Sequence, residues 1–558
     1  MLRALFLCSG MLAVAWLEFQ VFPGHTYLQS GTQIYLPVLE RLDTPGFLSR
    51  DLVATNPFVS YTIYDEVTLV LHQVGHLDFR TALTAQQFLF RVASLTGFFL
   101  LARATGLTDL FALLIATLVN LGAVIPSAAA CLVDPEPVPR AFALGLTFLA
   151  MGLLAREKPL LSGLTAGFAL IYDPATSAPF WIVCLCAFAL DRKQRPLIRP
   201  MLPILLVFLL LLANMAQLQP GVTAGGSLFT KLSDELAQLQ QYRTPYVWVS
   251  LWAARDIWHY LAISVLGLWA AARMWPVLNR QMRWIAIGVG LSGVLSVLVS
   301  YVLLDRLRLA VAAQIQPAKA LIFTVALSSL LAGLAGMRAV LHRRNREAFC
   351  WFALVMALPF DTQILDFLRV FELKHFIELA LCVSLAATLT LLLARFKARW
   401  RFAVVVVPLA GIFLMARMLR PNIPDQRASR SAYELANWAE RYTWGSSMFL
   451  FPDAGRALYP GIFRAASRRA LWTDWTSGVE VDYSALAGIE WWRRWQDTMQ
   501  NGFVPARLEK MLTLPIDYYV LRSQNKLAGV RAAFTDDEFV AYDAEDLRNA
   551  QFPLRLQH

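Results

Sequence analysis

Long apolar runs recur along most of this chain, and short loops rich in arginine and lysine separate them. Of the 558 residues, 57% are hydrophobic and only 16% are charged. An α-helix needs about twenty apolar residues to cross a bilayer, and a chain with so many apolar runs cannot bury them all in one water-soluble core. The sequence therefore predicts a polytopic α-helical membrane protein.

About thirteen of these runs are predicted as transmembrane helices. They cover residues 2–22, 82–103, 107–127, 139–155, 159–173, 176–190, 200–217, 257–273, 284–304, 320–338, 347–360, 379–394 and 402–418. The runs at 159–173 and 347–360 are short, and half-buried or re-entrant segments are the alternative there.

The basic residues fall in alternate short loops, as the positive-inside rule expects of cytoplasmic loops. The chain has 50 Lys and Arg against 39 Asp and Glu, a formal net charge of +11. The clearest basic loops lie at residues 156–158, 192–199, 273–283, 338–346 and 395–401. The excess of positive charge therefore indicates how the chain is oriented in the membrane, and it does not indicate a nucleic-acid partner. It predicts a cytoplasmic N-terminus and a C-terminal part outside the membrane.

The loop between the first two apolar runs, residues 23–81, is the first candidate for a functional site. It is long for a connection, and long loops in compact proteins are usually functional. Two helices at the membrane interface are predicted within it, at about 32–42 and 58–74, because apolar and polar residues alternate there with helical spacing. The acids of this loop that could do chemistry are Asp43, Asp51, Asp65 and Glu66.

Two further outer loops carry acids at the start of an apolar run. Asp134, Glu136 and Arg140 surround three prolines, and Asp173 precedes Pro174. Helix capping explains acids at such positions equally well. An ionisable group at the membrane edge is nevertheless a candidate for a functional role.

Two cations on the outer side are candidates for binding an anion. Arg243 lies in a segment rich in aromatic residues, and a planar guanidinium just outside the bilayer suits a phosphate or pyrophosphate. Lys319 lies in a short outer loop that is basic against the positive-inside trend. Nearby acids such as Asp361 and Asp366 could instead be its partners.

The composition becomes that of a soluble domain after about Arg420. Strands predicted at 448–451, 469–472, 518–521 and near 539–542 alternate with helices at 428–442 and 483–500. This order predicts a transmembrane domain over 1–418 and a small α/β domain over 419–558, outside the membrane. The helix at 483–500 contains Trp491, Trp492 and Trp495, which either pack the domain onto the membrane unit or form a sugar-stacking or lipid-facing surface.

Several common catalytic motifs are absent from the sequence. It has no Walker A loop, no dinucleotide fingerprint after a strand, no HExxH and no GxSxG. The sequence therefore contains no motif that would indicate nucleotide-driven transport or hydrolase chemistry of those types.

In layout the chain resembles the GT-C class of polytopic glycosyltransferases, which includes protein O-mannosyltransferases and lipid A aminoarabinose transferases. One span, a long outer loop with two interfacial helices, about a dozen further spans and an outer C-terminal domain all match. The segments at 134–140, 172–174, 463–468 and 491–494 are similar to a bacterial branch of that class. Members often place an Asp-Glu pair just before the first interfacial helix, where this sequence has Gly31, Thr32 and Gln33.

The resemblance implies a transferase in the bacterial inner membrane that takes a sugar from a polyprenyl phosphate and passes it to an acceptor outside. A carboxylate would act as general base, and a cation or a divalent metal ion would stabilise the leaving phosphate. Asp51 is the first candidate for the base, before Asp43, Asp65 and Glu66. Arg243 is the first candidate for the phosphate. A non-catalytic scaffold of the same fold in envelope polysaccharide assembly is the alternative.

The orientation can be tested at the C-terminus. A reporter enzyme that is active only outside the cytoplasm should be active when fused after His558, because the alternation of basic loops places that end outside. Activity of a cytoplasm-only reporter at the same position would contradict the predicted topology.

Overall fold

The computed structural model describes residues 2–21, 23–29, 31–56, 62–218, 230–357, 373–395, 426–500, 502–550 and 553–557. The chain divides into two compact units, each built from segments that are far apart in sequence. Unit 1 takes in Met1–His25, Leu83–Leu218 and Pro245–Arg420. Unit 2 takes in Thr26–Ala82, Gln219–Thr244 and Pro421–His558.

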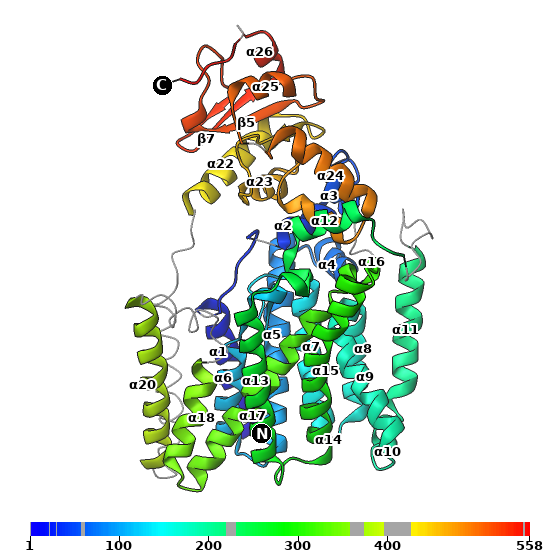
Figure 1. Ribbon diagram of the computed structural model, residues 1–558, viewed down its shortest axis with the longest axis vertical. Helices are drawn as coiled ribbons and strands as arrows, with labels where there is room; N and C mark the ends of the chain where they lie inside the picture. Colours follow the sequence, from blue (N-terminus) through cyan, green and yellow to red (C-terminus); the bar gives the residue numbers. More distant parts are fainter. Residues whose placement is uncertain are drawn as a thin grey trace. The chain divides into compact units, whose positions relative to one another are not determined.

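Unit 1 is a bundle of helices that lie side by side (Figure 1). Its main helices are α1 (Leu2–Gln20), α5 (Phe79–Ala104), α6 (Asp109–Asn120), α7 (Pro139–Ala155), α8 (Pro159–Tyr172), α9 (Pro174–Leu190), α11 (Met201–Leu218), α13 (Ala254–Met274), α15 (Gly290–Ser300), α17 (Leu321–Leu341), α18 (Asn345–Ala357) and α20 (Leu373–Arg395). Short elements complete it: β1 (Val124–Ile125), β2 (Ala130–Cys131), α10 (Arg195–Ile198), α14 (Arg280–Arg283), α16 (Ala310–Ile315) and the η turns between them.

Most of these helices fall where the apolar runs predict them, and α7 has the predicted bounds. The prediction for 107–127 is wrong in its last third, because α6 ends at Asn120. Gly122 then takes a positive φ of 95°, and the short antiparallel pair β1 and β2 follows. The helix predicted at 402–418 and residues 358–360 lie outside the described residues.

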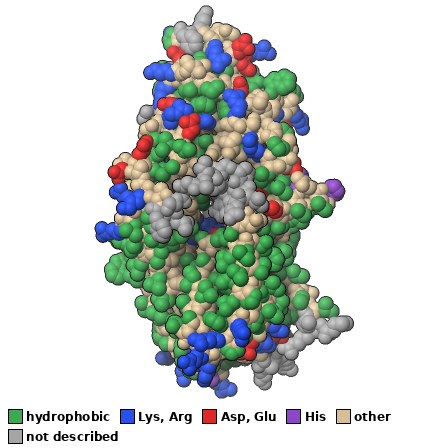
Figure 2. Space-filling model, turned by 90° about the vertical axis from the view of Figure 1, so that its right-hand side faces the viewer, with side chains coloured by type: hydrophobic (Ala, Val, Ile, Leu, Met, Phe, Trp, Pro, Cys, Tyr) green, Lys and Arg blue, Asp and Glu red, His purple; other side chains and the backbone are tan. Residues whose placement is uncertain are grey.

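Apolar side chains cover the flank of unit 1, and Lys and Arg gather at its lower end (Figure 2). Among the described residues, four helical stretches are long and apolar enough to cross a membrane: Phe79–Ala104, Ala254–Met274, Arg280–Arg306 and Ala310–Leu341. In Ala310–Leu341, 94% of the most apolar 18-residue stretch is buried, so this helical stretch lies at the centre of the bundle. In Arg280–Arg306 the buried share of that stretch is 28%, so it lies at the periphery. The part of the chain that the structure describes also contains seven shorter apolar helices.

Helices α5 and α7 approach each other through glycines. A Cβ added at Gly145 would lie 2.3 Å from the carbonyl oxygen of Phe90, and one at Gly97 would lie 2.3 Å from the carbonyl carbon of Phe148. Such contacts between backbones are possible only where side chains are absent. Small residues let helices pack closely in a membrane, where no hydrophobic effect drives them together.

Unit 2 contains a five-stranded sheet in the order β4-β3-β5-β7-β6. The strands are β3 (Met448–Leu450), β4 (Ala470–Leu471), β5 (Tyr518–Arg522), β6 (Phe534–Thr535) and β7 (Phe539–Asp543). Strand β3 pairs in parallel with β4 and β5, while β7 is antiparallel to β5 and β6. Four of these strands lie at the predicted positions, and β6 was not predicted.

The two faces of this sheet pack against different helices (Figure 1), because side chains alternate along each strand. Met448 and Leu450 face a core with α24 (Ala485–Thr498), α25 (Pro505–Met511) and α26 (Ala544–Arg548). Phe449 faces the other way and packs against Phe463 of α23 (Tyr459–Ser467), with 4.8 Å between the ring centroids. Helix α22 (Gln426–Tyr442) lies beside α23.

The first outer loop and residues 230–244 belong to the same unit as this sheet. The loop forms α2 (Thr32–Asp43), α3 (Leu52–Thr55) and α4 (Tyr64–Gln73), and the other segment forms α12 (Asp234–Arg243). Leu52 and Leu239 are part of the sheet's hydrophobic core. The predicted helix at 32–42 is confirmed. The helix predicted at 58–74 begins only at Tyr64, because Thr62 and Ile63 form a bend, and residues 57–61 lie outside the described ones.

The glycine contact between α5 and α7 gives a test of the bundle. Gly145→Ala should lower the melting temperature of the purified full-length protein, since overpacking typically costs about 1–3 kcal/mol. The matched control is Gly290→Ala in α15, where an added Cβ meets no atom within 4 Å. It should be neutral or stabilising by up to about 1 kcal/mol. Equal effects of the two variants would contradict this packing.

Candidate functional site

The residues predicted to form a site divide between the two units. Unit 1 holds Asp134, Glu136, Arg140, Asp173 and Lys319. Unit 2 holds Asp43, Asp51, Asp65, Glu66 and Arg243. Each group is therefore described within its own unit.

In unit 1 the acids of two loops gather around Arg140, at the first turn of α7. Its Nη2 donates to Asp134 Oδ2 at 3.0 Å, and Asp173 also attracts its positive charge. Asp173 caps α9, accepting from the backbone N–H of Ala175 at 3.2 Å and from the hydroxyl of Thr176 at 2.7 Å. Capping and charge pairing thus occur together at these residues.

Lys319 and Cys131 belong to the same neighbourhood. Burial and the charge of Asp134 raise the pKa of the Cys131 thiol to about 11, while Arg140 and Lys319 act to lower it. Lys319 lies over the ring of Tyr246, with 5.8 Å from Nζ to the centroid. Glu136 is 1% exposed. Its backbone N–H donates to Asp134 Oδ1 at 3.2 Å, so the structure brings the five unit 1 residues into one polar region of the loops between the helices.

Two charged residues that were not predicted extend this region into the bundle. Arg91 of α5 donates to the backbone oxygens of Gly24 at 2.5 Å and Asp134 at 3.0 Å. Glu18 of α1 is fully buried, and Asn120 donates to its Oε2 at 2.5 Å. The signal was present in the sequence, because a charged residue inside an apolar run is by default a functional candidate.

A cavity lies beside Arg91 in this region. Gln87, Arg91, Ser94 and Asp134 supply its polar wall, and the remaining lining is mostly apolar. It has room for about one water molecule. A sugar would need the surrounding side chains to move.

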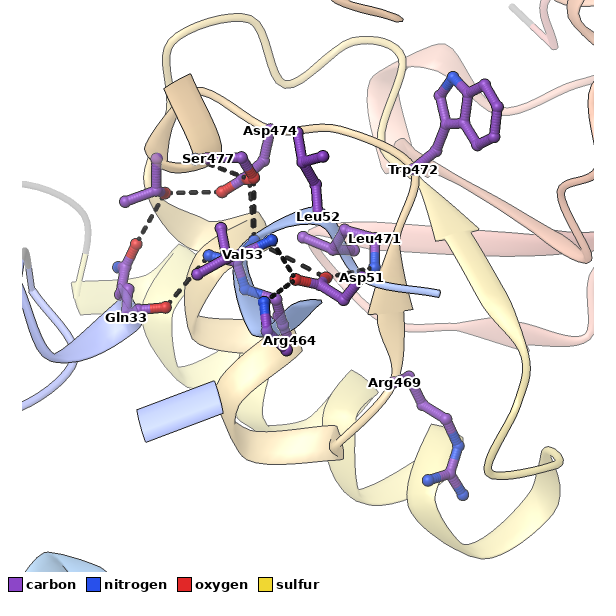
Figure 3. Close-up of polar contacts among 12 residues, drawn as sticks. Gln33, Asp51, Leu52, Val53, Arg464, Arg469, Leu471, Trp472, Asp474 and Ser477 are labelled. Atoms are coloured by element: carbon purple, nitrogen blue, oxygen red, sulfur yellow. Dashed lines mark hydrogen bonds and ion pairs between the residues drawn. The ribbon is translucent and has the colours of Figure 1, made fainter. Parts of the chain in front are cut away.

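In unit 2 the carboxylate of Asp51 is fully buried and bonded to backbone (Figure 3). Oδ1 caps α3, accepting from the N–H groups of Val53 at 3.0 Å and Ala54 at 3.2 Å. Oδ2 accepts from the N–H of Leu471 in β4 at 3.0 Å. Burial raises the pKa of Asp51, and Arg464 and these N–H groups oppose the rise. The role of Asp51 as base remains a prediction, and its contacts are those of a structural cap.

Arg464 is the buried cation at the centre of the same cluster (Figure 3). Its Nη1 donates to Asp474 Oδ1 at 3.0 Å and lies 3.9 Å from Asp51 Oδ2. Although burial acts to raise the pKa of Asp474, Arg464 and the Ser477 and Thr476 hydroxyls bring it below its ordinary value. Burial raises the pKa of Glu480 well above its ordinary range, despite Arg464. Burial therefore favours the uncharged form of Glu480 relative to an exposed glutamate.

Thr32 and Gln33 occupy the positions where the resemblance expects an acidic pair, and both are fully buried. Gln33 Nε2 donates to the carbonyl oxygens of Leu28 at 2.8 Å and Leu458 at 3.1 Å. Its Oε1 accepts from the hydroxyl of Thr476 at 3.1 Å. An amide can both donate and accept in this way, whereas an ionised carboxylate would face two carbonyl oxygens.

Asp65, in the first turn of α4, has the environment most typical of an acid-base group. It is 5% exposed, and its Oδ1 has no hydrogen-bond partner among the described residues. Burial, with the adjacent Glu66, raises the pKa of Asp65 to about 8. Glu66 itself is exposed.

Asp43 is held at the end of α2 by neighbouring side chains. Gln73 Nε2 and the Thr44 hydroxyl each donate to it at 3.1 Å. His72 Nε2 lies 3.8 Å from Asp43 Oδ2, while His72 Nδ1 donates to the carbonyl oxygen of Leu77 at 2.6 Å. Asp43 is therefore a partly exposed acid beside an anchored imidazole.

Arg243 ends α12 and lies flat against a tryptophan. Its Nε donates to the carbonyl oxygen of Trp475 at 2.9 Å, and its Cζ lies 4.5 Å from the centroid of that ring. Stacking of this kind fixes a guanidinium in one orientation.

The binding of a divalent metal ion remains a prediction. Among the residues that the structure describes, no group of three or more His, Cys, Asp or Glu side chains is arranged to hold a metal ion.

The fold is similar to that of ArnT from Cupriavidus metallidurans, an aminoarabinose transferase of the GT-C class. Its apo crystal structure matches with a TM-score of 0.52 at 12% identity, over 97% of this chain and 98% of that chain. The structure of ArnT bound to undecaprenyl phosphate matches with a TM-score of 0.51 at 13% identity, over the same shares. No protein-family model and no curated protein sequence matches the chain. The likeness confirms the GT-C-like fold that the sequence predicts.

The buried cluster around Asp51 leads to a stability test. Asp51→Asn should lower the free energy of unfolding by about 3 kcal/mol or more, because the amide would turn a donor toward Leu471 or Arg464 and leave a buried charge less compensated. Urea unfolding monitored by tryptophan fluorescence measures this. Asp497→Asn, at an acid with 54% side-chain exposure, should change it by less than about 0.5 kcal/mol. An unchanged stability of Asp51→Asn would show that the cap is dispensable.

Proposed function

We propose that this protein is an integral-membrane glycosyltransferase that takes a sugar from a polyprenyl-phosphate donor and passes it to an acceptor on the outer face of the membrane. The observation that carries the proposal is the likeness to ArnT, which extends over nearly the whole of both chains and includes a structure with undecaprenyl phosphate. The proposal places the protein in a bacterial inner membrane with about thirteen spans. The N-terminus is then cytoplasmic, and residues 419–558 lie in an α/β part on the periplasmic side.

The outer-loop region of unit 1 is proposed to receive the donor phosphate. Arg140 and Lys319 supply positive charge there, and Asp134 and Asp173 hold the guanidinium of Arg140 in place. Charge-assisted bonds from a guanidinium are among the strongest that a phosphate can accept. Arg243 of unit 2 is the further candidate, because Trp475 already orients its guanidinium.

Asp65 is proposed as the general base. In the transfer, the bond between the anomeric carbon and the phosphate oxygen breaks with its electron pair on the phosphate. The acceptor oxygen bonds to that carbon and gives its proton to the base. A base with a pKa near 8 is matched to this task near neutral pH, and Asp65 has such a pKa. Asp43 and Glu66 are the next candidates, and the full bonding of Asp51 supports it least.

Transfer of labelled sugar from a polyprenyl phosphate by the purified protein tests the proposal. The rate should rise with pH through about 8, since the base must be ionised, and Asp65→Asn should lower it by about 10²- to 10⁴-fold. The matched control is Asp78→Asn in the same loop. Asp78 is exposed and caps α5 through the N–H of Thr81, and Asn is as good a cap.

The pH dependence of unfolding reports the burial of Asp65, and the transfer rate reports its role in catalysis. The pKa of Asp65 is higher in the folded than in the unfolded chain, so its stabilising contribution is complete below about pH 4 and is lost as pH rises through about 8. Asp65→Asn should therefore flatten the pH dependence of unfolding in either case. An unchanged transfer rate in this variant would move the base to Asp43 or Glu66. A folded protein without transfer from any donor would support the scaffold alternative.

A further inference from the structure

Helix α24 carries exposed apolar side chains at intervals of three residues. Leu486 is 84% exposed and Ile489 is 39% exposed, and Trp492 is half-buried one turn further on. Trp491 and Trp495, by contrast, are 0% and 2% exposed and pack into the core of the sheet. Trp491 and Trp495 therefore lie within this core, and the half-buried Trp492 packs against it from the surface. Leu486, Ile489 and Trp492 together form a strip along the helix.

The strip continues onto Tyr242 of α12 and ends at the guanidinium of Arg456. The ring of Tyr242, which is 37% exposed, lies 5.3 Å from that of Trp492. Arg456 is exposed, and its Cζ lies 5.0 Å from the Tyr242 centroid and 4.6 Å from the Trp475 centroid. No ion pair joins Arg456 to a carboxylate of the described residues. We call Leu486, Ile489, Trp492, Tyr242 and Arg456 the α24 face.

We propose that the α24 face binds the surface of the lipid bilayer and takes anionic headgroups at Arg456. Exposed leucine and isoleucine beside tryptophan, tyrosine and arginine are the composition of helices that lie in a membrane interface. The apolar residues enter the boundary of the acyl chains. The amphipathic aromatic rings lie at the level of the headgroups.

Charge and chain order favour a bilayer over a protein partner. The charges on the C-terminal half of α24 balance one another, because Glu490 pairs with Arg493 and Arg494 and Asp497 lies 3.6 Å from Arg493. The positive charge of the face therefore comes from Arg456, and an anionic lipid surface complements it. Tyr242 also lies twelve residues before Ala254, where the membrane-spanning stretch of α13 begins. The chain thus carries this face close in sequence to a membrane helix.

The test places a fluorophore on the face in the full-length protein. The six native cysteines are replaced, Leu486→Cys is labelled with an environment-sensitive dye, and the protein is incorporated into nanodiscs whose lipids carry a nitroxide quencher. The matched control is Asp537→Cys, at an exposed residue in the turn between β6 and β7. Emission at position 486 should shift to the blue and be quenched by the lipid, whereas position 537 should show neither effect.

A second measurement avoids the cysteine replacements. In the unmodified chain, hydroxyl-radical labelling of Leu486 and Ile489 should be weaker in nanodiscs with anionic lipid than in detergent. Arg456→Gln should lower the ratio of bound to free face in anionic nanodiscs by roughly five-fold, the worth of one basic residue at an anionic membrane. It should have no such effect in zwitterionic nanodiscs.

Three results would overturn the proposal. Equal quenching at positions 486 and 537 would show that the bilayer does not reach the face. Protection of Leu486 in lipid-free detergent would show that protein covers it, either a second copy or another partner. A blue shift at position 486 without quenching by the lipid, seen only with two copies per nanodisc, would assign the face to an interface between copies of this chain.

Discussion

The structure of unit 2 depends on the hydrogen bonds and the ion pairs that the buried guanidinium of Arg464 makes. It donates to Asp474 and, through Nη2 at 3.1 Å, to the backbone oxygen of Gln33, and it lies near Asp51. The cluster therefore joins the first outer loop to the segment after α23. Removing one partner from such a buried network typically costs about 3–5 kcal/mol, because the remaining charge has lost its compensation. Burial raises the pKa of Glu480, which is the third acid beside this single cation.

The helices of unit 1 could be predicted because each apolar run carries its own signal. The error at 121–127 had a local cause that the sequence also contained, in Gly122 and Pro126. By contrast, nothing local indicates that residues 26–82 and 230–244 share a core with the sheet. Such pairings depend on packing between segments hundreds of residues apart, and no periodicity within either segment records them.

The site was predicted unevenly for similar reasons. Arg140 and Asp173 were found from their positions at helix starts, and the structure brings them together. Asp51 was selected for its place in a long loop, yet an Asp directly before Leu52 and Val53 is also a helix N-cap signal. Glu18 and Arg91 were missed although each is a charge within an apolar run. At Gln33 the sequence departs from the pattern that the family resemblance expects, and the structure shows a complete set of hydrogen bonds for the amide.

Unit 2 is assembled from segments that are far apart in sequence. It can therefore finish folding only after the ribosome has made nearly the whole chain. The N–H of Leu471 is 420 residues away from the Asp51 carboxylate that it meets, and Arg464 is 431 residues away from the Gln33 oxygen. At about 5–20 residues per second, roughly 20–80 s pass between the synthesis of these partners. Throughout that interval Asp51 Oδ2 lacks its partner and the apolar side of the first loop is uncovered. The segments of this unit that are made first therefore stay without their partners until the last quarter of the chain has been made.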